Sequence, residues 1–272
     1  VDRLMSEADV VIHLAAAVGV QLVIDHPVRT IETNIIGTEA VLKAALRYRR
    51  RTLIASTSEV YGKGSRLPFS EDDDVLLGST AKRRWAYAAS KMVDEFLALA
   101  YHVEHELETV VFRLFNTVGP RQTGRYGMVL PRFVRQALRG DNITVYGDGT
   151  QRRCFCDVRD AILAIEGLAS SPTSPGHVFN IGGTEEISIA DLAERVRVAA
   201  NSTASVIRVP YVDAYGPGFE DMVRRVPDTS RIQALLGWTP TRSLDAIIAD
   251  VVAFERSALG RIWTSVERAR RK

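Results

Sequence analysis

Two groups of polar residues in this sequence could carry out acid–base chemistry. The first is Tyr87 and Lys91, which stand four positions apart in the stretch WAYAASK. On a helix this spacing puts both side chains on one face, about one turn apart. A lysine ammonium beside a phenol favours the phenolate, so we expect Lys91 to lower the pKa of Tyr87 and make it a general base. The pair alone is equally typical of a solvated helix face.

The second group is Thr57, Ser58 and Glu59, directly after the apolar run RRTLIAS at residues 50 to 56. Such runs are typical of buried strands. Because a parallel sheet opens its active crevice at the carboxyl ends of its strands, a polar ledge at a strand end is well placed for catalysis. A simple polar turn closing the strand is the alternative.

The elements that must position these residues alternate between strands and helices. Strands are predicted at 8–14, 50–56 and 108–114, and helices at 27–48 and 82–103. This rhythm is typical of an α/β protein with a doubly wound parallel sheet covered on both faces. The helix at 82–103 should carry one apolar face, formed by Trp85, Ala89, Met92, Phe96, Ala100 and Val103.

Beyond about residue 120 the elements become shorter. Strands are predicted at 142–147, 177–181 and 205–209, and helices near 128–139, 157–169, 188–200 and 243–257. We expect this part to form a smaller lobe that meets the sheet at a cleft, where ligands usually bind.

The composition narrows the classes of function. The chain has 272 residues, of which 46% are hydrophobic and 25% charged, and its net charge is +2. This balance favours neither nucleic acid nor an anionic membrane as a partner. No apolar run approaches the roughly 20 residues that span a bilayer, so a cytoplasmic location is expected. Cys154 and Cys156 have neither a zinc nor a disulfide spacing, and we expect no metal site.

Six motifs are spread over nearly the whole chain: HLAAAVGV (13–20), TNIIGT (33–38), STSEVYG (56–62), YAASK (87–91), RLFNTVGPRQ (113–122) and VYGDGTQRRCF (145–155). Together they resemble the extended short-chain dehydrogenase/reductases that modify nucleotide sugars. This resemblance implies a Rossmann domain that holds NAD, a C-terminal lobe that holds a nucleoside-diphosphate sugar, and hydride transfer from the sugar to NAD+. We accordingly assign residues 1–122 to the remainder of the NAD-binding domain and 123–272 to the sugar-nucleotide lobe, with interleaved boundaries.

The resemblance also implies roles for individual residues at the reacting end. Tyr87 is the base that removes the proton of a sugar hydroxyl, conventionally the one on C4, and Lys91 lowers its pKa and holds the nicotinamide ribose. Thr57 hydrogen-bonds the reacting oxygen. The positions matched to cofactor contacts are Leu14, Ala15, Ala16, Thr33, Tyr87 and Lys91.

At the substrate end the resemblance implies contacts to a nucleoside-diphosphate sugar, most simply a UDP-sugar. Asn116 matches an amide that reaches the diphosphate, and Arg153 matches a guanidinium that clamps it, since paired planar donors suit phosphate oxygens. Tyr146 matches a nucleoside contact, although a structural strand tyrosine is the alternative. Relatives commonly dimerise through the helix that bears Y-x-x-x-K, so we expect a homodimer.

One departure from the family concerns the glycines. The family opens with a strand and a Gly-rich turn that lets the backbone approach a pyrophosphate. None of the 19 glycines here forms G-x-G-x-x-G or G-x-x-G-x-x-G. We therefore expect the sequence to be a fragment whose first βα units are missing, and to bind NAD poorly by itself.

The residues after Thr57 bear on which reaction is catalysed. Dehydratases of the family resemble one another in carrying Asp-Glu there, and simple 4-epimerases more often carry small or neutral residues. Ser58 and Glu59 are instead the pair found in UDP-glucuronate decarboxylases, and RRVPD (224–228) resembles the stretch where those enzymes place an active-site arginine, here Arg225. Oxidation at C4 creates a β-keto acid that loses CO2, and Arg225 could seat the carboxylate or help protonate the enolate.

UDP-glucuronate decarboxylation is therefore the expected reaction. The alternatives are a UDP-hexose 4-epimerase, a sugar-nucleotide 4,6-dehydratase and a truncated, non-catalytic nucleotide-sugar-binding protein. The last is disfavoured because Thr57, Tyr87, Lys91 and Arg153 are all present.

Overall fold

The structure, a computed structural model, describes residues 1–123, 128–216 and 219–270, with the side chains of the last helix described up to residue 257. Its central feature is a four-stranded parallel sheet in the order β1-β2-β3-β8. These strands are Val10–His13, Arg51–Thr57, Thr109–Leu114 and Val178–Ile181. The predicted doubly wound α/β fold is confirmed. Strand β8 lies beyond residue 122, so the sheet draws on both halves of the chain.

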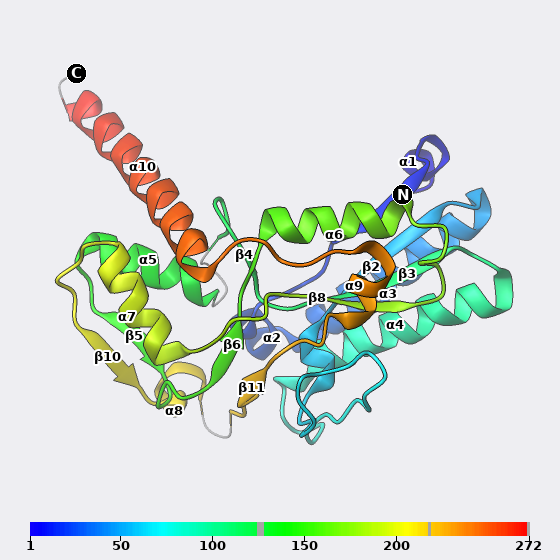
Figure 1. The fold of residues 1–272 in the computed structure, drawn as a ribbon, viewed down its shortest axis with the longest axis horizontal. Coiled ribbons are helices and arrows are strands. Elements are labelled where there is room, and N and C mark those ends of the chain that lie inside the picture. The colour runs from blue at the N-terminus through cyan, green and yellow to red at the C-terminus, as the bar shows by residue number, and fades with distance from the viewer. Residues whose placement is uncertain (124–127, 217–218, 271–272) are drawn as a thin grey trace.

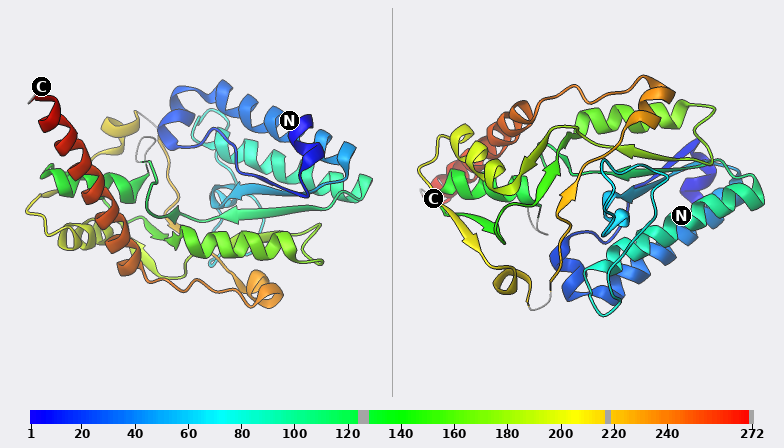
Figure 2. Two further views of the ribbon diagram at one scale, coloured as in Figure 1. Left: turned by 90° about the horizontal axis from the view of Figure 1, so that it is seen from above. Right: turned by 60° about the horizontal axis from the view of Figure 1, so that its bottom comes forward.

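Helices cover both faces of this sheet (Figures 1 and 2). Alternate side chains of a strand point to opposite faces, and β3 shows this clearly. Val111 packs with residues of helices α3 (Pro27–Tyr48) and α4 (Trp85–His105). Val110 and Phe112 pack with residues of α6 (Val158–Ser170) and α9 (Ser230–Leu236). The sheet is therefore buried on both sides at β2, β3 and β8, whereas Val10 and Ile12 of β1 are exposed.

Local sequence explains where several of these helices begin and end. Helix α3 begins at Pro27, a residue suited to the first helical position, and ends at Arg49, which has a left-handed backbone. Helix α6 begins after Asp157, whose side chain accepts a hydrogen bond from the backbone N–H of Arg159. In helix α7 (Ile189–Ala199) Ser188 plays the same part toward Asp191.

The apolar face predicted on helix α4 is only partly covered. Trp85 is 3% exposed, but Phe96 is 68% and Val103 79% exposed. The buried face carries charged residues instead, including Lys91 and Glu95. Those charges are accommodated by ion pairs, such as Glu95 with Arg113 of β3 at 2.7 Å. Much of the apolar stripe of α4 therefore lies on the surface.

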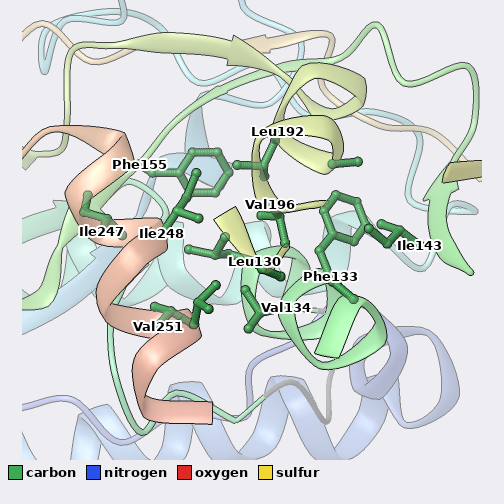
Figure 3. Close-up of a cluster of buried hydrophobic side chains, with 14 of the residues drawn as sticks. Leu130, Phe133, Val134, Ile143, Phe155, Leu192, Val196, Ile247, Ile248 and Val251 are labelled. Carbon is green, nitrogen blue, oxygen red and sulfur yellow. The ribbon is translucent and has the colours of Figure 1, made fainter. Parts of the chain in front are cut away.

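A second hydrophobic core belongs to the smaller lobe. Strands β5 (Ile143–Tyr146) and β10 (Val206–Val209) pair in parallel there. Helices α5 (Val129–Arg139), α7 and α10 (Leu244–Arg270) surround a cluster that includes Phe133 and Val196 (Figure 3). Within the part of the chain that is described, no helix combines the length and apolarity needed to cross a membrane.

Short elements connect the sheet and the lobe. Strand β6 pairs with β9 and β11, and β4 pairs with β7. Their bounds are β4 Thr117–Val118, β6 Arg152–Cys154, β7 Cys156–Asp157, β9 Glu186–Ser188 and β11 Arg224–Arg225; the remaining elements are α1 Asp2–Glu7, α2 Val20–Asp25, the 3-10 helix η1 Ser58–Tyr61 and α8 Tyr211–Tyr215.

Candidate active site

A cavity of about 490 Å³ gathers most of the predicted site residues. Its walls come from the loop after β1, the end of β2, the start of α4 and the segments around β6 and β11. The predicted residues that line it are Leu14, Ala16, Thr57, Ser58, Glu59, Tyr87, Lys91, Asn116, Tyr146, Arg153 and Arg225. Two predicted cofactor contacts, Ala15 and Thr33, are exposed and do not line it. Thr33 precedes the buried Asn34 on α3, and one helical step of about 100° turns it outward.

Thr57 marks the carboxyl end of β2 and starts the turn that carries Glu59. Its backbone is extended, and its hydroxyl accepts a hydrogen bond of 3.3 Å from the backbone N–H of Glu59. This is the arrangement of a helix N-cap. Ser58 is buried, and Glu59 lies in the first turn of η1. Thr57, Ser58 and Glu59 therefore form a fixed strand end that faces the cavity.

The surroundings of Tyr87 oppose its ionisation. Burial raises the pKa of the Tyr87 phenol, the negative charge of Glu59 raises it further, and a hydrogen bond with the Thr57 hydroxyl only partly offsets both. Lys91 is not poised to help, because its Nζ lies 2.7 Å from Oδ2 of Asp94 and both side chains are buried. The predicted lowering of the Tyr87 pKa by Lys91 is therefore wrong for this arrangement.

Glu59 is held as a carboxylate by two arginines. Its Oε2 accepts a hydrogen bond of 2.9 Å from Nη1 of Arg84, and its Oε1 accepts one of 3.3 Å from Nη1 of Arg225. Burial by itself would raise the pKa of Glu59, but Arg84 and Arg225 outweigh it and the pKa is lowered. Arg225 is itself deeply buried, and burial together with Arg153 lowers its pKa to about 10.

The predicted substrate residues line the same cavity. Nδ2 of Asn116 donates to the backbone oxygen of Cys154 at 2.9 Å. Arg153 donates to the backbone oxygen of Arg152 at 2.8 Å and to Oδ2 of Asp221 at 2.9 Å. The guanidinium group of Arg132 stacks on the ring of Tyr146, and the distance from its Cζ atom to the ring centre is 3.9 Å.

Sequence reasoning missed several residues that line this cavity. Arg84 lies one helical turn before Tyr87 and could have been found from that spacing. Asp221 could not, because its two arginine partners are 137 and 68 residues away in sequence. An aromatic group completes the wall near Tyr146, formed by Tyr211, Tyr215 and Phe219.

The loop after β1 forms the remaining wall and suits a nucleotide cofactor. Leu14, Ala16, Val18 and Gly19 line the cavity there. Asn34 fixes this loop, because its Oδ1 accepts a 2.7 Å hydrogen bond from the backbone N–H of Ala17. Small and apolar side chains on a fixed backbone, next to the Tyr87 and Lys91 pair, leave room for a flat nucleotide beside the reacting groups.

A second cavity, of about 900 Å³, lies on the outer side of α4 around Phe96 and His177. Its charged groups pair with one another, as in the 2.7 Å contact of Arg113 with Glu95 and the 2.6 Å contact of Arg231 with Asp72. The smaller cavity, where the acid–base residues meet, is therefore the candidate active site.

Comparison with known proteins identifies the family. The model of the NAD dependent epimerase/dehydratase family matches residues 1–182. The chain belongs to this family. Its cofactor is NAD.

Among members of the epimerase/dehydratase family, two curated relatives are decarboxylases by name. The chain is 40% identical to the UDP-N-acetyl-alpha-D-glucosaminuronate decarboxylase of Bacillus cytotoxicus, over 93% of this chain and 78% of that protein. It is 36% identical to UDP-glucuronic acid decarboxylase 3 of Arabidopsis thaliana, over 88% of this chain and 67% of that protein.

A solved member of the family has the same fold. The structure of the UDP-glucuronic acid 4-epimerase of Bacillus cereus, in complex with UDP-glucuronic acid and NAD, superposes with a TM-score of 0.84 at 28% identity. The superposition covers 94% of this chain and 78% of that one. Relatives with this fold thus include both decarboxylases and epimerases.

Proposed function

We propose that this protein is an NAD-dependent decarboxylase of UDP-linked uronic acids, with UDP-glucuronate as its substrate. The observation that carries the proposal is the pairing of Arg225 with Glu59 at 3.3 Å in the cavity that also holds Tyr87. The guanidinium groups of Arg84 and Arg225 line this cavity. A uronate carboxylate can pair with such a group, because guanidinium and carboxylate match in charge and shape.

The side chains that line the cavity suit the different parts of such a substrate. Arg153 and Asn116 would hold the diphosphate, and Tyr146 with the neighbouring aromatic rings would contact the nucleoside. The sugar then lies toward Thr57 and Tyr87, where acid–base chemistry is available. The name of the Bacillus cytotoxicus relative suggests that an acetamido group on C2 is a second form of the sugar to test.

Tyr87 and Thr57 act on the first half of the reaction, at C4 of the sugar. NAD would be held by the loop after β1 together with Tyr87 and Lys91, and it would supply the removal of a hydride from C4 of the sugar and the return of that hydride after CO2 has left. Tyr87 removes the proton of the C4 hydroxyl, and Thr57 hydrogen-bonds that oxygen. In the resulting β-keto acid the bond between C5 and the carboxyl carbon breaks, and its electrons move to the C4 oxygen.

Arg225 and Glu59 act on the following protonation at C5. The Arg225 guanidinium faces the developing negative charge and stabilises it. Because Arg84 and Arg225 keep Glu59 ionised, Glu59 orients a water molecule that gives its proton to C5, and the hydroxide left behind is taken up by CO2 as bicarbonate. Tyr87 returns its proton to the C4 oxygen as C4 is reduced. Ser58, at the same strand end, assists the transfer through its hydroxyl.

A product assay tests this proposal. The protein is incubated with NAD+ and UDP-glucuronate, UDP-N-acetylglucosaminuronate or UDP-glucose, and the nucleotide sugars are separated. We expect a UDP-pentose from the first substrate. If no UDP-pentose forms while UDP-glucose and UDP-galactose interconvert, the protein is a 4-epimerase and the proposal fails.

We further propose that the protein is a homodimer that buries the exposed apolar stripe of α4. This stripe includes Val93, Phe96 and Val103, which are 39%, 68% and 79% exposed. A second copy would cover it symmetrically, as in most closed dimers. Family resemblance favours the same helix.

A further inference from the structure

Asp221 accepts hydrogen bonds from two arginines that come from distant parts of the chain. Its Oδ1 lies 2.9 Å from Nη2 of Arg84, and its Oδ2 lies 2.9 Å from Nη2 of Arg153. The same two oxygens also accept from the backbone N–H of Met222 at 2.8 Å and from the hydroxyl of Tyr211 at 3.4 Å. Both carboxylate oxygens are thus fixed by several donors, and the side chain has little freedom to move.

Asp221 is also the centre of a row of alternating charges in the wall of the cavity. The row runs Arg153, Asp221, Arg84, Glu59 and Arg225, and each neighbouring pair is joined by a hydrogen bond of 2.9 to 3.3 Å. Its first and last members are themselves neighbours, because Arg153 of β6 and Arg225 of β11 are paired residues of adjacent strands. The five side chains therefore form one cluster, and all of them line the same cavity.

The two arginines depend on Asp221 to different degrees. Arg153 has further anchors, because its Nη1 donates to the backbone oxygens of Arg152 and Val223 at 2.8 and 3.4 Å. The hydrogen bonds described for Arg84 go only to Glu59 and Asp221. Removing the Asp221 carboxylate would therefore release Arg84 more than Arg153.

We propose that Asp221 is a positioning residue for the reaction, tying Arg84 to Arg153 and thereby setting where Glu59 lies. This inference rests on the proposed function, because it assumes that Glu59 serves the chemical step. Without Asp221, Arg84 can turn both of its outer nitrogens toward Glu59 and draw that carboxylate away from Arg225. The grip of Arg153 on the diphosphate would survive, since its backbone anchors remain.

The variant Asp221→Asn tests this inference, because it keeps the shape of the side chain and removes its charge. The test measures kcat for CO2 release from UDP-glucuronate with NAD+, and the Kd of UDP alone by calorimetry. We expect kcat to fall at least tenfold while the Kd of UDP changes by less than about threefold. A kcat within twofold of the wild type, or a raised Kd at unchanged kcat, would overturn the inference.

Two control variants separate positioning from loss of fold. Glu220→Gln removes a neighbouring charge whose partners are Trp85 and Lys63, outside the row. Asp160→Asn alters a buried carboxylate that accepts hydrogen bonds from Thr241, away from the cavity. Both should keep kcat within twofold of the wild type, even where Asp160→Asn lowers the Tm. A tenfold loss of kcat in Glu220→Gln would contradict a specific role for Asp221.

If Asp221→Asn does not fold, a second substitution at the same position can test the inference. Asp221→Glu retains the charge and displaces it by one methylene group, so we expect kcat to fall at least threefold with UDP binding unchanged. A wild-type kcat in this variant would overturn the inference. Because the wild type is assayed first, absence of CO2 from the wild type identifies a failure of the proposed function instead.

Discussion

Tyr87 occupies a position where its proton is hard to remove in the protein alone. Burial and the Glu59 carboxylate both raise its pKa, and Lys91 is paired with Asp94. A base in such a place works only when the substrate and cofactor change the charges around it. The Y-x-x-x-K spacing in the sequence located both residues correctly, but it could not reveal that a buried aspartate one turn further along would take up the lysine.

Replacement of Tyr87 tests its role as the base. Tyr87→Phe removes only the phenol oxygen, so the fold and the diphosphate contacts should persist. We expect turnover of UDP-glucuronate to fall at least a thousandfold, near the upper range for general bases, while the Kd of UDP stays within about threefold. Activity within a few-fold of the wild type would remove Tyr87 from this role.

At the scale of elements, Asp157 links a helix start to the stability of the lobe. It caps α6, accepting 2.8 Å hydrogen bonds from the backbone N–H of Arg159, and also pairs with the side chain of Arg159 at 2.7 Å. Burial would raise the pKa of Asp157, but the hydrogen bonds from Arg159 outweigh it and the pKa is lowered. We expect Asp157→Ala to lower the free energy of unfolding at pH 7 by about 1 to 2 kcal/mol.

Asp157 should also make the stability of the fold depend on pH, with lower stability at acidic pH. A carboxyl whose pKa is lower in the folded state stabilises the fold above its unfolded pKa, and this stabilisation is lost as the pH falls through the folded value. The difference in unfolding free energy between the wild type and Asp157→Ala should therefore shrink as the pH falls below 3.8, the ordinary pKa of an aspartate side chain. Denaturant titrations at pH 7 and pH 3 check this. An equal difference at both pH values would show that charge plays no part.

The exposed stripe of α4 makes a prediction about assembly. Phe96→Glu places a charge in the centre of the surface proposed to meet a second copy, so the protein should become monomeric. Analytical ultracentrifugation of the wild type and the variant measures this directly. The matched control is Ile162→Glu, on α6, which is 55% exposed and belongs to the other face of the sheet. A monomeric wild type would contradict the proposed dimer.

Across the whole molecule, patterns that depend on neighbouring residues were predictable. The helix at 27–48, the strands near 50–56 and 108–114, and the parallel sheet all follow from local apolar periodicity and were confirmed, with the first of these strands ending one residue later, at Thr57. The exposed half of the α4 stripe was not foreseen, because periodicity finds an apolar face without saying what covers it.

Contacts between distant segments were the part of the site that the sequence could not reveal. Motif matches brought Glu59 and Arg225 to one site in advance, yet the second arginine partner of Glu59, Arg84, and the link through Asp221 emerged only from the fold. Side chains that lie 137 residues apart leave no local trace of their pairing.

The most direct test of the proposed reaction follows the carboxyl carbon of the substrate. The protein is mixed with NAD+ and UDP-glucuronate labelled with carbon-13 at C6, and the label is followed by NMR. Decarboxylation moves the label from the sugar into CO2 and bicarbonate as an unlabelled UDP-pentose forms. If the label stays in the sugar and appears in UDP-galacturonate, the protein epimerises its substrate and the assignment of Arg225 and Glu59 to decarboxylation is wrong.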